Sequence, residues 1–328
     1  MLPLPRVLYW SHAPESVYAV LREAAQGKAD LRTLPSDDQA ARRRALAQAQ
    51  VLIVAARGLP AQELAFAPHL RLVHHQGVGY QDTVPVADLQ ARGIRLALTP
   101  EGTTTGVAEH TVMLLLAACK RLAHVDAELR QGRWHVNTYR SVCRELCGMT
   151  VGLVGFGRIG QAVAARLQGF GAHVVYSDPG ISAPVMTLGA GAAHAMPLQN
   201  LLASADAVTL HLPSTPATRH LIDAAALARM KRGAFLINAS RGGLVDEAAL
   251  AQALLSGHLA GAGLDCFEQE PPPPDHPLLA LPNVVLTPHT AAATIDALRT
   301  KMAALFANVA RWHRDGELQN EVQLGAHG

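Results

Sequence analysis

The chain is poor in cysteine, and its four cysteines show no pattern that would build a scaffold. They are Cys119, Cys143, Cys147 and Cys266, in 328 residues. So few thiols exclude a disulfide framework and favour a reducing compartment. Cys143 and Cys147 have the separation of a ligand pair, but no second pair follows at a metal-ligand spacing. We therefore expect packing cysteines and no metal site.

Long apolar runs and a strong charge of either sign are also missing. The longest apolar stretches, residues 51–56 and 112–119, are far too short to cross a bilayer. The first six residues, MLPLPR, lack the basic and apolar regions of a signal peptide, so we expect a cytoplasmic protein. The net charge is only +2. A balanced charge gives no basic face for phosphates, which argues against nucleic acid as an obligatory partner.

What the sequence does contain is an alternation of short β-branched runs with segments rich in alanine and leucine. This alternation predicts parallel sheets joined by crossover helices, and the length suits about two domains. The expected strands are residues 6–10, 51–54, 72–74, 150–154, 173–177, 207–212, 235–238 and 284–287, and the clearest helices are residues 108–119, 160–170 and 246–256.

The strongest local motif is the segment VGLVGFGRIG at residues 151–160, which is typical of a strand, a glycine turn and a helix start. Gly155 would permit the tight turn, Gly157 would let the backbone approach a pyrophosphate, and Gly160 would let the helix pack closely on the strand. The amino end of the helix adds free N–H groups and a partial positive charge for the anion. The motif alone is weak evidence, because a glycine-rich turn without a ligand looks the same.

Its context strengthens the prediction of a dinucleotide site. A second strand ends at Asp178, about twenty residues after the glycines, where a carboxylate can accept the ribose hydroxyls of the adenosine. The same carboxylate would repel a 2′-phosphate, so NAD is favoured over NADP. A plain turn before Pro179 is the alternative reading of Asp178. Because the motif begins only at Val151, a separate domain is expected in front of the cofactor domain.

Three downstream segments place candidate chemical groups just after apolar stretches. They contain Arg241, the pair Asp265 and Glu270, and His289. Polar residues at the carboxyl ends of strands face the ligand crevice of open α/β sheets. Arg241 could bind a carboxylate through two hydrogen bonds, and a histidine is suited to proton transfer near neutral pH. The spacing alone does not pair Glu270 with His289, and each residue alone could equally be a surface group.

Taken together, these segments closely resemble the D-isomer-specific 2-hydroxyacid dehydrogenase family, from about Leu70 to Ala310. The matching motifs are the glycine loop, the segment ASRG at residues 239–242, the segment DCFEQEP at residues 265–271 and the segment PH at residues 288–289. The stretch from Thr99 to Glu109 looks like the family's entry into the helix between its two domains. The chain's end implies no regulatory domain of the kind that long phosphoglycerate dehydrogenases carry.

The resemblance implies roles for individual residues. His289 would be the acid/base, Glu270 its partner, and Arg241 would bind the substrate's carboxylate and polarise its keto oxygen. Asp265 would hold the nicotinamide carboxamide. The residues expected to contact the cofactor are Gly155, Gly157, Arg158, Ile159, Gly160, Asp178, Leu212, Pro213, Thr218, Ala239, Ser240, Arg241, Asp265 and His289. The substrate-binding residues would be Gly77, Val78, Gly79 and Arg241.

The fold implied is α/β, with two Rossmann-like or flavodoxin-like parallel-sheet domains and the active site in the cleft between them. Residues 1–99 and 291–328 would form a discontinuous substrate-binding domain, and residues 100–290 the NAD-binding domain. The implied assembly is a homodimer joined through the cofactor domains, with the region of Trp134 reaching the partner's cleft. His74 and His75, unusual for the family, would either line the pocket or end the strand.

The implied function is hydride transfer between NAD(H) and a small D-2-hydroxy acid or 2-keto acid such as glyoxylate, hydroxypyruvate or pyruvate. Two alternatives stay open at this point. An NAD-sensing regulatory protein on the same scaffold would keep the same three side chains, and a bare dinucleotide-binding module would bind NAD without turnover.

Overall fold

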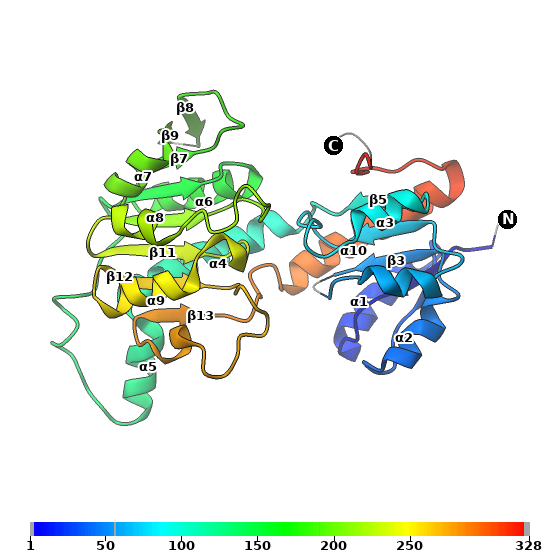
Figure 1. Ribbon diagram of the computed structural model, residues 1–328, viewed down its shortest axis with the longest axis horizontal. Coiled ribbons are helices and arrows are strands. Elements are labelled where there is room, and N and C mark those ends of the chain that lie inside the picture. The colour runs from blue at the N-terminus through cyan, green and yellow to red at the C-terminus, as the bar shows by residue number, and fades with distance from the viewer. Residues whose placement is uncertain (1–2, 56, 190, 325–328) are drawn as a thin grey trace. The chain divides into compact units, whose positions relative to one another are not determined.

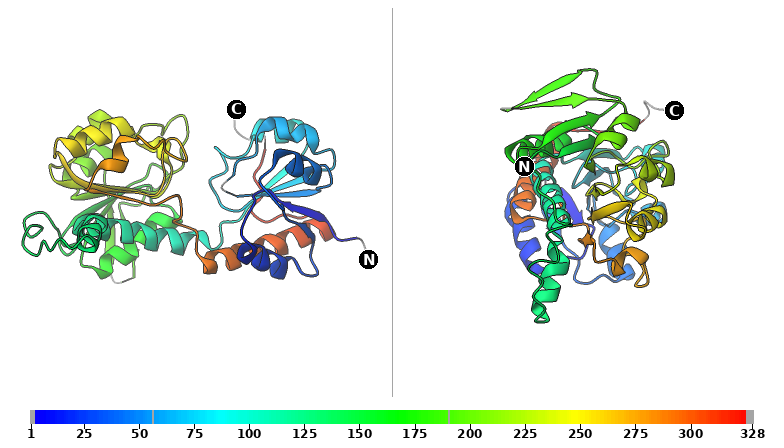
Figure 2. Two further views of the ribbon diagram at one scale, coloured as in Figure 1. Left: turned by 90° about the horizontal axis from the view of Figure 1, so that it is seen from below. Right: turned by 90° about the vertical axis from the view of Figure 1, so that its left-hand side faces the viewer.

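The computed structural model describes residues 3–55, 57–189 and 191–324. The chain forms two compact units: Met1–Thr103 with Ala293–Gly328 as unit 1, and Thr104–Ala292 as unit 2. Each unit is a parallel sheet covered by helices on both faces (Figures 1 and 2). The expected fold class, two parallel-sheet α/β domains, is confirmed.

Unit 1 is built on a five-stranded sheet with the order β2-β1-β3-β4-β5, and all its pairs are parallel. The strands are β1 (Arg6–Tyr9), β2 (Asp30–Arg32), β3 (Val51–Val54), β4 (Leu72–His75) and β5 (Arg95–Leu98). One face packs against α1 (Glu15–Ala25) and α10 (Ile295–Asp315), and the other against α2 (Gln39–Leu46), η1 (Ala61–Phe66) and α3 (Val86–Ala91). Because both faces are covered, β3 is a continuous apolar run with every residue buried.

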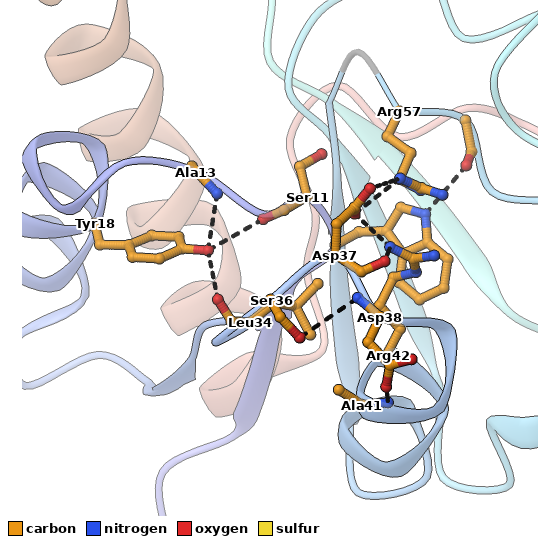
Figure 3. A network of polar contacts seen from close by, with 12 residues as sticks. Ser11, Ala13, Tyr18, Leu34, Ser36, Asp37, Asp38, Ala41, Arg42 and Arg57 are labelled. Carbon is orange, nitrogen blue, oxygen red and sulfur yellow. Dashed lines mark hydrogen bonds and ion pairs between the residues drawn. The ribbon is translucent and has the colours of Figure 1, made fainter.

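Polar side chains hold the loops that follow β1, β2 and β3 (Figure 3). The Tyr18 hydroxyl donates to the Leu34 carbonyl at 2.9 Å and accepts from the Ala13 N–H at 2.9 Å. Asp37 binds the guanidinium groups of both Arg42 and Arg57. These contacts satisfy backbone and charged groups at the carboxyl end of the sheet, the edge at which open α/β sheets hold ligands.

Unit 2 is built on an eight-stranded sheet with the order β13-β12-β11-β10-β6-β7-β9-β8. The strands are β6 (Thr150–Val154), β7 (His173–Ser177), β8 (Val185–Leu188), β9 (Gly191–Ala195), β10 (Ala207–Leu210), β11 (Ala234–Asn238), β12 (Leu259–Leu264) and β13 (Val284–Leu286). The order of connection reverses between β6 and β10. Their carboxyl ends therefore form the topological switch point at which such sheets bind ligands.

Helices cover both faces of this sheet as well. Buried residues of α4 (Thr103–Lys120) and α6 (Arg158–Gly169) pack on one face. On the other face pack α7 (Leu198–Ser204), α8 (Ala224–Arg229) and α9 (Glu247–Leu255). The remaining elements are α5 (Leu122–Arg130), η2 (Gly242–Leu244) and η3 (Pro277–Ala280). No helix among the described residues is long and apolar enough to span a bilayer.

Two features of the sheet differ from the sequence-based expectation. Strand β8 pairs with β9 in the antiparallel direction, so the sheet is not entirely parallel. A tight connection of this kind can only join antiparallel neighbours, because a parallel pair needs a longer crossover. Strands β8, β9 and β12, the last with the sequence LAGAGL, were not among the strands predicted.

Candidate active site

The glycine turn after β6 has the geometry that its sequence predicts. Gly155 has φ +89°, and a Cβ there would lie 2.4 Å from the His211 carbonyl oxygen. A Cβ on Gly160 would lie 2.5 Å from the Gly155 carbonyl oxygen, so helix α6 can approach the turn only with glycine at that position. Gly157, at the N-cap of α6, is exposed and faces open space. The turn therefore fits a pyrophosphate, with the helix N–H groups directed at the anion.

Asp178 lies directly beside this turn, at the end of β7. Its Oδ2 accepts the Phe156 N–H at 2.7 Å, and its Oδ1 accepts the Gly180 N–H at 2.8 Å. The neighbouring Gly155 N–H donates to the Ser177 carbonyl at 2.9 Å. These bonds hold a carboxylate next to the predicted pyrophosphate position, which is where an adenosine ribose would need it.

The loops after β10 and β11 are joined to each other. The Ser240 hydroxyl donates to the Leu212 carbonyl at 2.7 Å, and the Thr218 hydroxyl closes its own turn by donating to the Pro213 carbonyl at 2.8 Å. Leu212 N also lies close to Gly155. The predicted cofactor residues of three separate strands, β6, β10 and β11, thus meet at one edge of the sheet.

Asn238, fully buried at the end of β11, shapes the turn that carries Arg241. Its side-chain Nδ2 donates to the Arg241 carbonyl at 2.8 Å, and its Oδ1 accepts the Ser240 N–H at 3.1 Å. The next residue, Gly242, lies against a neighbouring loop: a Cβ on it would be 1.9 Å from the Phe267 carbonyl carbon. The Arg241 main chain is therefore fixed independently of its own side chain.

Glu270 and His289, which the sequence could not pair by spacing, are in direct contact. His289 Nδ1 lies 2.8 Å from Glu270 Oε2, and both side chains remain partly exposed, at 42% and 39%. Glu270 Oε1 accepts the Phe267 N–H at 3.0 Å, which leaves Oε2 for the imidazole. His289 has φ +54°, in the left-handed region that few residues other than glycine adopt. Such backbone strain is characteristic of functional positions.

The charges of Arg241, Glu270 and His289, which we call the candidate triad, act on one another. The hydrogen bond that His289 donates to Glu270 raises the pKa of His289 above its usual value, against opposing effects of burial and Arg241. Burial alone would raise the pKa of Glu270, but the hydrogen bonds from His289 and the Phe267 N–H and the charge of Arg241 lower it overall. The pair is therefore disposed to exist as imidazolium and carboxylate.

The turn that bears His289 is held by Asp265, at the end of β12. Its carboxylate is 1% exposed and accepts the Thr287 hydroxyl at 2.6 Å, the Thr290 N–H at 2.8 Å and the Ala291 N–H at 2.8 Å. His110 of α4 approaches the same carboxylate at 3.3 Å. Burial would raise the pKa of Asp265, but these hydrogen bonds lower it. Asp265 thus positions His289, while its predicted contact with the nicotinamide carboxamide stays a prediction.

A pocket of about 400 Å³ opens beside the Glu270–His289 pair. It is lined by Phe267, Glu270, Pro271, Pro272, Leu279, Leu286, Thr287, Pro288 and His289. Apart from the two charged partners and Thr287, the lining is apolar. The Glu270–His289 pair therefore lies beside mostly apolar surface, while both of its side chains stay partly exposed.

The predicted substrate loop, Gly77–Gly79, follows β4 in unit 1. The ring of His75 lies beneath it: a Cβ on Gly77 would contact His75 Cε1 at 3.5 Å. His74 instead belongs to the core, where it is bonded to Thr99 at 3.3 Å and Asn308 at 3.1 Å. Burial lowers the pKa of His74 to about 4. The loop and the candidate triad lie in different units, so a cleft that joins them stays a prediction.

Two site residues escaped the sequence analysis: Asn238 and His110. Asn238 had a weak signal, since it follows an apolar strand directly and precedes the ASRG segment. His110 gave none, because a histidine inside an apolar helix is usually a packing residue. Among the residues that the structure describes, no group of three or more His, Cys, Asp or Glu side chains could hold a metal ion.

Comparison with known proteins agrees with this geometry. The family model "D-isomer specific 2-hydroxyacid dehydrogenase, NAD binding domain" matches residues 112–291. The glyoxylate reductase of Korarchaeum cryptofilum is 42% identical over 262 residues, which cover 79% of this chain and 78% of that protein. The chain belongs to the D-isomer specific 2-hydroxyacid dehydrogenase family.

Other members of this family differ in length and in cofactor. The D-3-phosphoglycerate dehydrogenase of Mycobacterium leprae is 42% identical over 297 residues, 90% of this chain but only 54% of that protein, so the chain spans about half its length. The D-lactate dehydrogenase of Aquifex aeolicus, solved with NAD and lactic acid, has a TM-score of 0.82 and 28% identity, with 94% of this chain and 96% of that one covered. A glyoxylate/hydroxypyruvate reductase of Sinorhizobium meliloti, solved with NADP and malonate, has a TM-score of 0.80 and 33% identity, with 98% of each chain covered.

Proposed function

We propose that this protein reduces a small 2-keto acid to the D-2-hydroxy acid with NADH, and catalyses the reverse oxidation. The observation that carries the proposal is the 2.8 Å contact between His289 and Glu270, within the electrostatic reach of Arg241. These side chains come from the sheet that bears the glycine turn. An acid/base, its carboxylate partner and a guanidinium are the groups that keto-acid reduction requires.

The proton chemistry follows from the Glu270 contact. An ionised Glu270 can only accept, so His289 Nδ1 carries a hydrogen and Nε2 holds the proton that is exchanged. When bound, the nicotinamide supplies the hydride that is added to the carbonyl carbon. His289 delivers its Nε2 proton to the carbonyl oxygen, and Glu270 stabilises the imidazolium until that transfer. Arg241 binds the substrate's carboxylate with two N–H groups and stabilises the negative charge that develops on the oxygen.

We infer a preference for NADH over NADPH from Asp178. Its carboxylate is held by two backbone N–H groups beside the glycine turn, so it cannot easily turn away from the adenosine ribose. A fixed negative charge there can accept two ribose hydroxyls but repels a 2′-phosphate. The substrate class, glyoxylate, hydroxypyruvate or a similar acid, follows the named glyoxylate reductase and glyoxylate/hydroxypyruvate reductase.

The deciding experiment is the oxidation of NADH and NADPH, followed at 340 nm, against glyoxylate, hydroxypyruvate, pyruvate and a 2-keto acid with a larger side chain. We expect turnover with at least one acid and a higher kcat/KM with NADH. Tight NADH binding without turnover on any acid would contradict the enzymatic proposal and support a regulatory protein on this scaffold. Turnover with NADPH alone would contradict the role of Asp178.

The Glu270→Gln variant should lose activity at a lower pH than the wild type. Ketone reduction requires protonated His289, so activity is full below the pKa of His289 and is lost as the pH rises through it. The hydrogen bond to Glu270 is the largest cause of the raised pKa, and a neutral amide does not favour imidazolium in the same way. The basic limb of the kcat/KM profile should therefore move to lower pH.

The control for this variant is Glu23→Gln, because Glu23 is exposed on α1 and no contact of its side chain is seen. The control profile should coincide with that of the wild type. A basic limb at the same pH in Glu270→Gln and wild type would contradict the proposed partnership of Glu270 with the acid/base.

We also propose that two copies associate through the face of unit 2 formed by α4, α5 and α6. Met113, Leu122, Leu129 and Phe170 are exposed apolar residues there, and the first, second and fourth of them line a groove of about 540 Å³. Apolar patches of this kind mark interaction sites, and a second copy is the commonest partner in soluble oligomers. Trp134, 75% exposed in the following loop, would then be available to the partner's site.

The Met113→Glu variant should weaken this association, because a charge would be buried without a partner. Sedimentation velocity at several concentrations should show a dimer for the wild type and a monomer for the variant. Leu255→Glu is the matched control, since Leu255 is also exposed, at 61% against 45% for Met113, but lies on α9, on the other face of the sheet. A monomeric wild type, or a dimer in both variants, would contradict the proposed interface.

A further inference from the structure

The carboxylate of Glu247, at the start of α9, is buried but does not cap its helix. Asp246 performs the capping, with its Oδ1 accepting the Ala249 N–H at 2.9 Å. Only 7% of Glu247 is exposed. A buried carboxylate is costly unless its oxygens are satisfied by donors, so its partners show what it does.

Both oxygens of Glu247 bind groups of the loop that carries Glu270 or of the segment after it. Oε1 accepts the backbone N–H of Glu268 at 2.8 Å, and Oε2 lies 2.9 Å from His276 Nε2. His276 Nδ1 accepts the Leu278 N–H, so Nε2 carries the hydrogen and donates to Glu247. The two contacts connect α9 to both ends of the segment between Phe267 and His276.

The peptide that Glu247 holds is in contact with the Arg241 turn. A Cβ on Gly242 would lie 1.9 Å from the Phe267 carbonyl carbon, 2.0 Å from its oxygen and 2.4 Å from the Glu268 nitrogen. The Arg241–Gly242 turn therefore packs directly on the Phe267–Glu268 peptide. Any shift of this peptide must displace the turn, since no free space separates them.

The peptide directly before it, Cys266–Phe267, orients Glu270. The Phe267 N–H donates to Glu270 Oε1 at 3.0 Å, and Oε2 of the same carboxylate binds His289 at 2.8 Å. Two adjacent backbone N–H groups, of Phe267 and Glu268, thus bind Glu270 and Glu247 respectively. The position of the Phe267 backbone therefore decides where the Glu270 carboxylate meets the imidazole.

The side chain of Glu268 binds a different set of groups from Glu247. Its Oε2 lies 2.9 Å from His220 Nε2 and 3.4 Å from Arg219 Nη2, and its Oε1 lies 3.4 Å from the Glu247 N–H. The side chain of Glu268 is more exposed than that of Glu247, and its contacts with Arg219 and with the Glu247 N–H are longer. Glu268 therefore supports the loop from the solvent side, while the buried contact is made by Glu247.

We propose that Glu247 is a positioning residue that fixes the distance between Arg241 and the Glu270–His289 pair by holding the Phe267–Glu268 peptide. It touches neither substrate nor cofactor and acts through one buried backbone N–H. Its effect on turnover rests on the proposed keto-acid reduction, but its effect on the His289 environment does not.

The test compares Glu247→Ala with Glu247→Gln, whose amide oxygen can still accept the Glu268 N–H although its amide nitrogen cannot accept the His276 Nε2–H. The first measurement is the titration of His289 by NMR, which needs no substrate. We expect the pKa of His289 to fall towards its usual value in Glu247→Ala and to stay close to that of the wild type in Glu247→Gln. An unchanged pKa in a folded Glu247→Ala protein would overturn the proposal.

The second measurement is kinetic. Misplacement of a reacting group by about 1 Å can cost about 10²-fold in rate. We expect kcat to fall by about that factor in Glu247→Ala, with an unchanged Kd for NADH, and to recover to within about threefold in Glu247→Gln. A lower Tm with wild-type kcat would show a merely structural residue and overturn the proposal.

If Glu247→Ala does not fold, Glu247→Asp takes its place, because aspartate withdraws the acceptor by one methylene. We expect the same changes in Glu247→Asp, and their absence would count equally against the proposal. An inactive wild type would instead contradict the proposed function, and the titration would still decide the role of Glu247.

Discussion

Alanine in place of His289 is expected to lower kcat for keto-acid reduction by about 10²- to 10⁴-fold, the range of a lost general acid. The Kd for NADH, measured by the quenching of protein fluorescence, should stay unchanged. The physical reason is the position of the imidazole. The ring lies outside the glycine turn, and among the described residues its side-chain hydrogen bond is with Glu270 Oε2. The loss of the ring removes the proton donor without removing a group that binds pyrophosphate.

The His289→Ala substitution should release little of the backbone strain at this position. His289 has φ +54°, and its N–H donates to the Asp265 carbonyl at 2.7 Å, a bond that alanine retains. The control is His69→Ala, because His69 is an exposed residue in a turn of unit 1. Wild-type turnover in His289→Ala would end the argument for an imidazole acid/base. A loss of both turnover and NADH binding would indicate that the ring is structural.

Replacement of Arg241 by alanine is expected to lower kcat/KM by about 10²- to 10³-fold, comparable to the loss of a transition-state hydrogen-bond donor. In the proposed function, the guanidinium stabilises the oxygen that becomes negative and also binds the substrate's carboxylate. Its main chain is held by Asn238 and by the contact of Gly242 with the Phe267 carbonyl, so the turn should survive the substitution. Arg241→Lys should recover only part of the activity, because an ammonium cannot make the two-pronged contact.

A substrate comparison separates this role from a general loss of charge. The wild type should reduce a 2-keto acid far faster than the matching 2-keto amide, because the amide lacks the carboxylate. In Arg241→Ala the difference between the two substrates should shrink, as in a double-mutant cycle on two groups in contact. Arg229→Ala, an exposed residue of α8, serves as the control. An undiminished preference for the acid in Arg241→Ala would show that another group binds the carboxylate.

Most of the fold could be predicted where the sequence pattern matches burial on both faces. The runs at residues 51–54, 150–154 and 173–177 are strands with the bounds expected. Strand β12 was missed because its composition, LAGAGL, is poor in β-branched residues. Its glycines are needed for packing: a Cβ on Gly261 would lie 2.8 Å from the Asn283 carbonyl, and one on Gly263 would lie 2.9 Å from Leu114 Cβ. That requirement comes from neighbours far away along the chain, so no local pattern could show it.

The candidate site also contains features that the sequence could show and features that only the folded chain creates. The glycine turn is largely a local feature, because the positive φ of Gly155 and the close approach of Gly160 to the Gly155 carbonyl lie within residues 155–160. The contact between Glu270 and His289 joins two strands, and only their order in the sheet brings the carboxylate to the imidazole. His110 and Glu247 could not be found from the sequence. His110 approaches Asp265, Glu247 accepts the Glu268 N–H, and both contacts form only in the folded chain.

By itself the sequence determined which chemical groups are available and where strands and glycine turns form, because covalent geometry and side-chain type act over a few residues. The tertiary structure decided which of sixteen histidines meets Glu270, and which buried groups hold the loops in place. The physical reason is that hydrogen bonds and desolvation depend on distance in space. Parallel sheet order, rather than separation along the chain, sets that distance for residues 241, 270 and 289.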